Sequence, residues 1–505
     1  MGITITNLSS VVAQRSLGVS SRQLALSLER LSSGLRINRG ADDPAGLIVS
    51  ERLRAEIAAV NQAIDNSNRA INVIATTEGA LNEINALLID IQALILEAAN
   101  SGAFSDAEVE ANQLQIDSAI DSITRIANTT TFAGQKLLDG SLDYVTSGVV
   151  TSEIAQVSVL GAKFGSRDFI PVDMLVSLSA LQGELVFPAS ATGPDAVTVD
   201  VQGADGIITL DFPASSTADA IITSINNQSD ATAVQASAAG YIDGSSPPVA
   251  SSVLIHTEGY GSSTFVRVEK IAGDGTFDLF TRVASTVPGL PDYSQPATLA
   301  DGRDAIATIN GASTTADGLK LSLNTSLLDM KVTLDAIYGA DNPLFDSAVK
   351  ALRRTFVITR GGALFQLGPH VNTNEQESIG VGSMQANKLG NRLVGFLSEL
   401  QSGQPNALRT ENFQEASDII DEVISQVTGL RGRLGSFERN TLQTNVNQLG
   451  ITAENLTASE STIRDTDFAA ETAELTRAQV LVSAGTSILA IANAQQQNIL
   501  ALLGG

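Results

Sequence analysis

Proline is distributed unevenly along the chain, and this limits where long helices can form. Of the 13 prolines in 505 residues, 11 lie between residues 141 and 390, whereas Pro44 lies before this region and Pro405 after it. Proline lacks a backbone donor and clashes with the preceding helical turn, so it interrupts helix interiors. The two ends of the chain are therefore free to form long helices, and the middle is not.

Apolar residues at both ends repeat at the spacing of helices that pack along one another. Two rows have a strict seven-residue repeat, and they consist of Ile74, Leu81, Leu88 and Ile95 near one end and Phe413, Ile420, Val427 and Leu434 near the other. Seven-residue spacing produces an apolar seam along which neighbouring helices wind around each other. We expect both termini to be mainly α, and to form one long-helix coiled-coil bundle from N- and C-terminal segments.

Two short motifs predict where helices begin. Residues 105–108 read Ser-Asp-Ala-Glu, a capping box in which the first and last side chains satisfy free backbone groups of the first turn. Asp43 directly precedes Pro44, the order expected for an N-cap residue and the first helical residue. Helices should therefore start at Pro44 and just after Ser105.

The middle of the chain predicts an inserted α+β, β-rich region. Alternating runs at 197–201 and 207–212 flank a Gly-Ala-Asp-Gly turn and predict a β-hairpin. A similar pair, 264–269 and 276–280, predicts a second hairpin, and residues 217–227 predict a short helix. This region is expected to form one or two variable outer modules.

The formal charge of the chain is −25, from 55 acidic and 30 basic residues. Such an excess repels phosphate backbones and anionic lipid head groups, so it disfavours nucleic-acid and membrane-surface binding. No run of about 20 apolar residues is present, so we expect no membrane insertion. Residues 1–14 contain no ordinary secretory signal peptide, so export, if it occurs, should use another route.

The two extreme ends carry no charge at all, over residues 1–14 and 478–505. One interpretation is a terminal helix of an ordinary core. In so acidic a chain, we instead expect these ends to be buried together between many copies. The residues predicted to form this polymerisation core are Leu8, Val11, Val12, Leu24, Leu28, Leu31, Leu475, Val482, Leu489, Ile499 and Leu503.

No catalytic or metal-binding pattern emerges from the sequence. The chain has no cysteine, which excludes disulfides, thiol nucleophiles and cysteine-ligated zinc. Its two histidines, His256 and His370, are far apart in sequence, and no metallopeptidase, nucleophile-elbow or phosphate-loop motif is present. Neither an enzyme activity nor a cofactor is expected.

A set of motifs across about 250 residues at the two ends resembles bacterial flagellin. At the N-terminal end they occupy residues 31–38 (Leu-Ser-Ser-Gly-Leu-Arg-Ile-Asn), 41–46 (Ala-Asp-Asp-Pro-Ala-Gly), 76–84 (Thr-Thr-Glu-Gly-Ala-Leu-Asn-Glu-Ile) and 132–138 (Phe-Ala-Gly-Gln-Lys-Leu-Leu). At the C-terminal end they occupy residues 430–436 (Leu-Arg-Gly-Arg-Leu-Gly-Ser), 455–461 (Asn-Leu-Thr-Ala-Ser-Glu-Ser), 463–469 (Ile-Arg-Asp-Thr-Asp-Phe-Ala), 477–479 (Arg-Ala-Gln) and 484–487 (Ala-Gly-Thr-Ser).

The resemblance implies three layers, two of which are built from both ends. Residues 1–43 with 458–505 would form a helical filament-core domain. Residues 44–180 with 345–457 would form an inner-tube helical bundle with β-hairpin elements, and residues 181–344 would form the variable surface-exposed α+β domains.

The connection between the first two layers would include Gly34, Gly40, Asp43 and Pro44. Gly34 lies within the motif at 31–38, Gly40 follows that motif, and Asp43 and Pro44 lie within the motif at 41–46, where the family passes from filament core to inner tube.

The resemblance also implies the function. Such a subunit polymerises into the helical flagellar filament outside the cell, after type III export without signal cleavage. Its partners would be other copies of itself, hook-associated junction and cap proteins, and a flagellar export chaperone. The alternatives are a hook–filament junction protein, or a flagellin-like carrier of an adhesive or glycosylated surface module.

Overall fold

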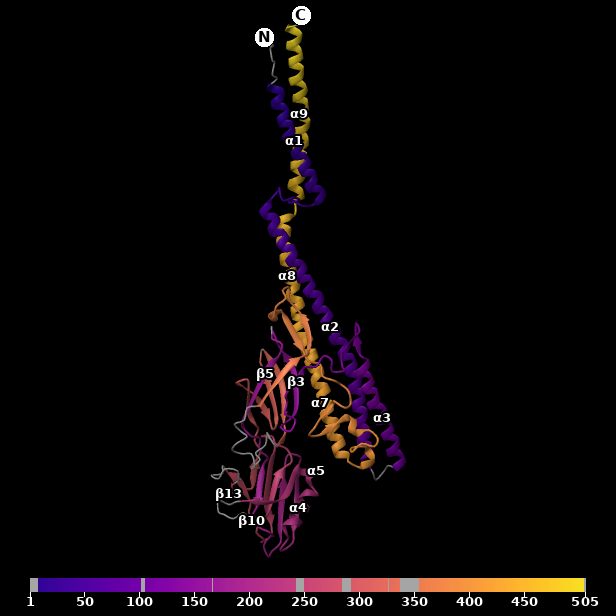
Figure 1. The fold of residues 1–505 in the computed structure, drawn as a ribbon, viewed down its shortest axis with the longest axis vertical. Helices are drawn as coiled ribbons and strands as arrows, with labels where there is room; N and C mark the ends of the chain where they lie inside the picture. Colours follow the sequence, from indigo (N-terminus) through magenta and orange to yellow (C-terminus); the bar gives the residue numbers. More distant parts are fainter. Residues whose placement is uncertain are drawn as a thin grey trace. The chain divides into compact units, whose positions relative to one another are not determined.

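The computed structural model describes residues 8–100, 105–165, 167–241, 249–283, 292–325, 327–336 and 354–503 (Figure 1). The chain divides into two compact units. The terminal unit contains residues 1–69, 366–371 and 439–505, and the central unit contains residues 70–365 and 372–438. Long helices from both ends and a β-rich middle confirm the predicted fold class.

The terminal unit is built from helices of both chain ends. It contains α1 (Leu8–Ser33), the first part of α2 (Pro44–Ala98), α8 (Thr444–Arg464) and α9 (Phe468–Leu503). α1 lies alongside α9 (Figure 1), and α2 packs against α8 through Val60, Ala63 and Leu449. Each of these two helix pairs therefore joins segments that are more than 350 residues apart in the sequence.

Both predicted helix starts are confirmed. α2 begins at Pro44, and the backbone N–H of Gly46 donates to Asp43 Oδ1 at 2.9 Å, as an N-cap requires. α3 (Asp106–Thr129) follows Ser105, whose backbone N–H donates to Glu108 Oε2 at 2.8 Å. Local capping chemistry therefore fixes these two boundaries.

The helical part of the central unit consists of α3, α7 (Phe413–Phe437) and the part of α2 that follows residue 69. The predicted seam of α2 is buried: Ile74, Leu81 and Leu88 are at most 1% exposed. α7 runs antiparallel to α2, with Arg431 donating to Asn82 Oδ1 at 3.1 Å and Gln92 donating to Asp421 Oδ1 at 2.7 Å. Of the predicted α7 row, Ile420, Val427 and Leu434 are buried, whereas Phe413 is half-buried.

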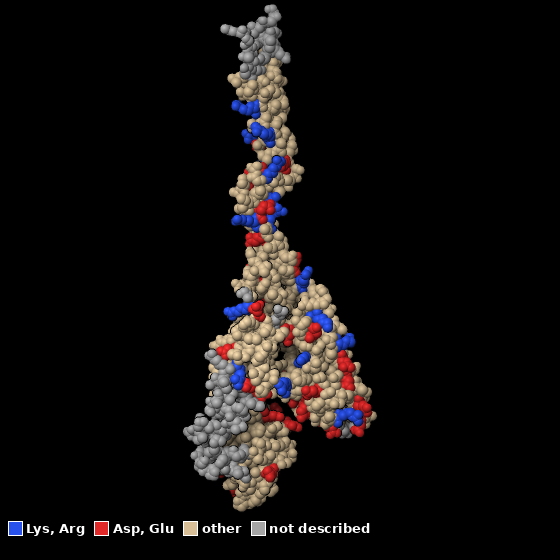
Figure 2. Space-filling model, in the orientation of Figure 1, with Lys and Arg blue, Asp and Glu red and all other residues tan. Residues whose placement is uncertain are grey.

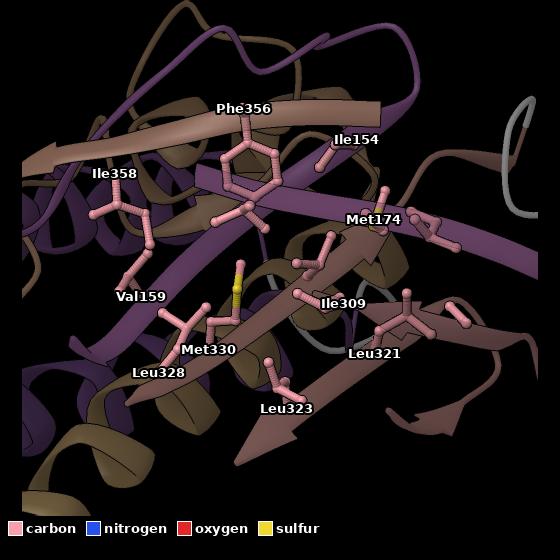
Figure 3. Packing of buried hydrophobic residues seen from close by; sticks show 14 of the residues in the cluster. Ile154, Val159, Met174, Ile309, Leu321, Leu323, Leu328, Met330, Phe356 and Ile358 are labelled. Carbon is pink, nitrogen blue, oxygen red and sulfur yellow. The ribbon is translucent and has the colours of Figure 1, made fainter. Parts of the chain in front are cut away.

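The β region contains two hydrophobic cores. The first lies between sheets of order β16-β15-β5-β20-β3 and β17-β18-β19-β4. Figure 3 shows Met174, Met330, Phe356 and Leu321 from four of these strands directed toward one another. The strands of this core are β3 (Val145–Ser147), β4 (Ile154–Ala162), β5 (Ile170–Leu178), β15 (Ile306–Ile309), β16 (Ala312–Ser313), β17 (Thr315–Asp317), β18 (Lys320–Asn324), β19 (Leu328–Leu334) and β20 (Arg354–Arg360).

The second core lies between sheets of order β13-β12-β6-β10-β9 and β14-β11-β7-β8, with α4 (Ala218–Asn226) packed against it. The strands are β6 (Glu184–Phe187), β7 (Val197–Gln202), β8 (Ile207–Phe212), β9 (Val234–Tyr241), β10 (Val249–Thr257), β11 (Phe265–Ala272), β12 (Phe280–Val283), β13 (Asp292–Pro296) and β14 (Leu299–Asp301). β7 and β8 pair antiparallel, which confirms the first predicted hairpin. α4 begins after its N-cap Thr217, which confirms the predicted short helix.

The second predicted hairpin is wrong. β11 pairs with β7 and β14, whereas β12 belongs to the opposite sheet and pairs with β6 and β13. The segment between them crosses the core, because Phe277 stacks on Phe187 at a centroid distance of 4.6 Å and on Phe212 at 5.9 Å. Burial of this ring outweighs the local turn signal.

The remaining elements are short. They are α5 (Ser229–Thr232), β1 (Thr131–Phe132), β2 (Gln135–Lys136), β21 (Ala363–Gln366), β22 (Gln376–Ile379), β23 (Gly390–Asn391), β24 (Gly395–Phe396), the 3₁₀ turns η1 (Thr373–Glu375), η2 (Leu397–Leu400) and η3 (Leu408–Thr410), and the π-helical turn η4 (Glu438–Gln443).

Asp304 accepts three hydrogen bonds that link turns of the two β cores. Its Oδ1 accepts the backbone N–H groups of Ser262 at 2.9 Å and Gly318 at 2.7 Å, and its Oδ2 accepts the Ser262 hydroxyl at 2.6 Å. The Ser262 hydroxyl, followed by the Gly318 backbone N–H, lowers the pKa of Asp304 below that of an ordinary aspartate. These bonds join the β10–β11 turn to the β17–β18 turn.

The substitution Asp304→Asn should lower the stability of the central unit at neutral pH by about 1–2 kcal/mol, because charge-assisted hydrogen bonds are lost. A carboxylate with a lowered pKa stabilises the fold above its unfolded pKa of about 4 and loses that contribution as the pH falls through its folded pKa. Thermal unfolding curves of the variant and the parent should therefore differ at pH 7 and converge in acid. Asp317→Asn, at an exposed position on β17, is the control and should show a smaller difference. A constant difference for Asp304→Asn at all pH values would contradict this role.

Candidate self-assembly surface

α1 and α9 contact each other through small side chains. Ser10, Ala13 and Ser27 of α1 are buried, as are Ala478 and Ala492 of α9. Small residues allow two helices to approach closely along a seam with seven-residue spacing. Small side chains therefore occupy the most deeply buried positions of this pair.

Two further contacts define the seam. Ser10 Oγ donates to Asn493 Oδ1 at 3.0 Å, which links the start of α1 to the distal part of α9. At Gly485, an added Cβ would lie 3.3 Å from Leu17 Cδ1, so only glycine fits there without displacement. The two helices therefore run antiparallel to each other and in close contact.

The larger apolar side chains of this pair point outward. On α1 the exposed ones are Leu8, Val11, Val12, Val19 and Leu28, and on α9 they are Phe468, Val480, Leu481, Ile488 and Ile491. Their exposed fractions run from 47% for Val12 to 71% for Leu8. We call these ten residues the outward apolar face.

The outward apolar face coincides with low charge. α9 carries no charged residue from Ala478 to Leu503, and α1 carries only Arg15, Arg22, Glu29 and Arg30. In Figure 2 the helix pair is mostly tan with a few blue groups, whereas red carboxylates are frequent on the central unit. Exposed apolar patches that extend over many residues mark surfaces that other molecules cover.

The structure separates the predicted core residues into two groups. Leu8, Val11, Val12 and Leu28 lie on the outward apolar face. The half-buried residues of the α1–α9 seam are Leu24, Leu31, Leu475, Val482 and Leu489. Ile499 and Leu503 lie in a part of α9 whose side chains fall outside the described residues, and the role of all eleven in polymerisation stays a prediction.

Six members of the outward apolar face were not predicted. They are Val19, Phe468, Val480, Leu481 and Ile488, together with Ile491 on the same helix as the last four. Leu481 and Ile488 repeat at seven residues directly beside Val482 and Leu489. A second apolar row next to the first, in a segment without charge, is the signal that could have identified them.

A polar cluster interrupts the seam near the connection. Arg30 Nη1 lies 3.5 Å from Glu471 Oε2, with side-chain exposures of 23% and 11%. Ser27 Oγ, Arg30 Nε and Glu471 Oε1 are buried without a hydrogen-bond partner among the described residues. A buried ion pair in a seam of small and apolar groups favours a single axial register of the two helices.

The connection between α1 and α2 pairs with the connection between α8 and α9. The backbone N–H of Arg36 donates to Arg464 O at 2.7 Å, and that of Thr466 donates to Gly34 O at 3.0 Å. Gly34 has a φ of +75°, a conformation that favours glycine and ends α1. These backbone hydrogen bonds hold the α1–α2 connection against the α8–α9 connection within the terminal unit.

The predicted connection residues differ in what they contribute. Asp43 and Pro44 start α2, and Gly34 ends α1, as described above. Gly40 has an ordinary φ, and a Cβ there would meet only Leu47 Cδ2, at 3.7 Å. Nothing in the structure requires glycine at position 40.

Among the residues that the structure describes, no group of three or more histidine, cysteine or acidic side chains could hold a metal ion. Windows in α2 and in residues 468–495 of α9 are apolar enough, with a mean hydropathy of 1.4, to match a membrane span. In α2 this apolarity is only partly that of the buried bundle seam, because the window is 28% buried. In α9 it belongs to the seam with α1 and the outward apolar face.

Comparison with known proteins identifies the family. The model of the bacterial flagellin N-terminal helical region matches residues 5–143, and that of the C-terminal helical region matches residues 417–503. The chain is 30% identical to a flagellin of Salmonella typhimurium, with 99% of both chains covered. It is 31% identical to the B-type flagellin of Pseudomonas aeruginosa, with 100% of both covered, and 26% identical to flagellin A of Helicobacter pylori, with 99% of both covered. The chain therefore belongs to the bacterial flagellins, the structural subunits of the flagellar filament.

Proposed function

We propose that the α1–α9 pair is the part through which copies of this chain join, and that its outward apolar face forms the centre of the filament. The observation that carries this proposal is the exposure of ten large apolar side chains on two helices that are poor in charge. Burying each such side chain contributes about 1.5–3 kcal/mol. Because the same contacts recur in every subunit, the total is large.

An open filament requires head-to-tail contacts, in which one surface meets a different surface of the next copy. The outward apolar face has members on both α1 and α9, so it presents two different helix surfaces to neighbours. This arrangement supports heterologous contacts. A single self-complementary patch would close into a dimer instead.

The layered organisation is part of the proposal. Residues 1–43 and 458–505 would form the filament core, 44–180 and 345–457 the inner tube, and 181–344 the surface domains. Support comes from the shared helix pairs, since α1 packs with α9 and α2 packs with α8. The second β core is built wholly from residues 185–300, within the proposed surface domains.

The partners and the location that we propose for the chain are those that its outward apolar face requires before and after assembly. Before assembly an exposed apolar face needs a cover, which we assign to a flagellar export chaperone. After type III export the chain would assemble outside the cell, where hook-associated junction and cap proteins would meet the ends of the filament.

Deletion of residues 478–505 tests the proposal. We expect the purified full-length chain to polymerise alone and the truncated chain to remain monomeric, as judged by electron microscopy and sedimentation. Circular dichroism of the central unit's strands provides the control, because both β cores lie outside the deleted segment. Normal filaments from the truncated chain would refute the proposal. A full-length chain that forms no extended filament by itself would favour the junction-protein alternative.

A further inference from the structure

Three polar atoms of the terminal unit are buried at one place between α1 and α9. They are Ser27 Oγ, Arg30 Nε and Glu471 Oε1, and none has a hydrogen-bond partner among the residues that the structure describes. Ser27 is fully buried, and Glu471 is 9% exposed. Ser27 lies three positions before Arg30 and so on the face of α1 that contacts Glu471. A buried polar atom without a partner is destabilising, so three at one place require an explanation.

The ion pair at this place is not closed. Arg30 Nη1 lies 3.5 Å from Glu471 Oε2, which is longer than the roughly 2.7–2.9 Å of a direct charge-assisted hydrogen bond. The more exposed pair Arg39–Glu29, in the same unit, makes two direct hydrogen bonds, from Nε at 2.9 Å and from Nη2 at 2.6 Å. The buried pair therefore leaves its Nε–H group and one carboxylate oxygen available to a third group.

The Ser27 hydroxyl is not used within its own helix. Serine and threonine side chains inside helices can donate to the carbonyl four residues earlier. Buried Ser67 of α2 does so, because its Oγ donates to Ala63 O at 2.9 Å. Ser27 makes no such bond to Gln23 O. Its hydroxyl is therefore also available to a group in the α1–α9 seam.

A group that satisfies these three atoms must both donate and accept hydrogen bonds. Arg30 Nε offers only a donor, Glu471 Oε1 only an acceptor, and the Ser27 hydroxyl can be either. An anion would be repelled by the Glu471 carboxylate, and a cation would be repelled by the Arg30 guanidinium. A water molecule matches all three atoms, and a buried water typically makes about three hydrogen bonds to otherwise unsatisfied groups.

We propose that Ser27, Arg30 and Glu471 form a binding site for one water molecule. The water accepts a hydrogen bond from Arg30 Nε, donates one to Glu471 Oε1, and shares its third with the Ser27 hydroxyl. It joins α1 to α9 where the direct ion pair is too long to do so. It also keeps both charged groups hydrated within a seam of small and apolar side chains, which lowers the desolvation cost of burying them.

The substitution Ser27→Ala tests the site through the sign of its effect. In the full-length, unassembled chain, amide hydrogen exchange along α1 and α9 should become about fivefold faster than in the control, because the water loses one partner. The matched control is Ser21→Ala, at an exposed position of α1, since both substitutions gain the helix propensity of alanine. If no water were bound, Ser27→Ala would remove an unpartnered buried hydroxyl, and exchange would be as slow as in the control or slower. That result would overturn the proposal.

Removal of the two charged partners should reverse this sign. In a chain that carries Arg30→Met and Glu471→Leu, the water would have only the Ser27 hydroxyl left. Adding Ser27→Ala to this chain should then slow hydrogen exchange along α1 and α9, because the substitution removes a hydroxyl that has lost its partner. The same acceleration in both backgrounds would show that Ser27 acts through packing alone, and it would contradict the water site.

Nuclear magnetic resonance observes the water directly. In the full-length chain with isotope-labelled arginine, the Arg30 Nε–H group should show a nuclear Overhauser effect to a long-lived water, and Ser27→Ala should weaken it. The exposed Arg477 is the control and should contact only rapidly exchanging solvent. Absence of the Arg30 signal from the parent chain, or α1 and α9 amides without protection there, would overturn the proposal. All of these readouts are made on unassembled chains, so they are separate from the test of filament formation.

Discussion

Replacing Ile488 and Ile491 together by aspartate is expected to abolish filament formation while leaving the subunit folded. In the subunit these side chains are 57% and 64% exposed, so neither packs extensively within its own chain. On assembly each substitution would lose about 1.5–3 kcal/mol of apolar burial and would also bury an unpaired charge. Since about 1.4 kcal/mol corresponds to a tenfold change in affinity, the concentration needed for assembly should rise more than about 100-fold.

Sedimentation and electron microscopy measure this effect. The matched control is Ile207→Asp with Ile271→Asp, which replaces two isoleucines of similar exposure on β8 and β11 of the second β core. Because this core belongs to the region proposed to lie at the filament surface, the control should still assemble. If the control variant lost assembly and the α9 variant kept it, the assignment of the two surfaces would be reversed.

Breaking the Arg30–Glu471 pair should have the second-largest effect. The substitution Glu471→Ala removes the ion-pair partner of the mostly buried Arg30 guanidinium, and removal of one partner of a buried pair costs about 3–5 kcal/mol. The loss should appear in the α1–α9 contact, as faster hydrogen exchange along both helices. Replacing both groups, by Arg30→Met with Glu471→Leu, should restore much of the protection because no unpaired charge remains.

The exposed pair Arg267–Glu269 is the control for this experiment. Its side chains are 49% and 54% exposed, so Glu269→Ala should change stability by less than about 1 kcal/mol. An effect of Glu471→Ala no larger than that of Glu269→Ala would show that the buried pair does not hold the two helices together.

Local signals predicted the helical ends because the chemistry that sets them is itself local. Asp43, Pro44 and the Ser105 capping box define helix starts by contacts within one turn. The heptad rows of α2 and α7 are likewise readable, since a buried face repeats with the period of the helix. The β7–β8 hairpin follows the same logic, because its turn and strands are contiguous in sequence.

The features that escaped prediction depend on contacts between distant segments. Phe277 packs on Phe187 and Phe212, so its segment crosses the second core. No residue near Phe277 in the sequence identifies these two partners. In the α1–α9 pair, Ser10 and Ala478 make the intramolecular contact, whereas larger residues such as Leu8 face outward. Reasoning from side-chain size assigns the largest apolar groups to the nearest core and so does not separate these two faces.

A cryo-electron microscopy structure of the filament formed by this chain would show directly whether the outward apolar face joins neighbouring copies. We expect Val480, Leu481 and Ile488 of each subunit, which are at least 49% exposed in the single chain, to become buried against α1 or α9 of neighbouring copies. A filament in which these side chains remain open to solvent, while copies contact one another only through their central units, would contradict this expectation.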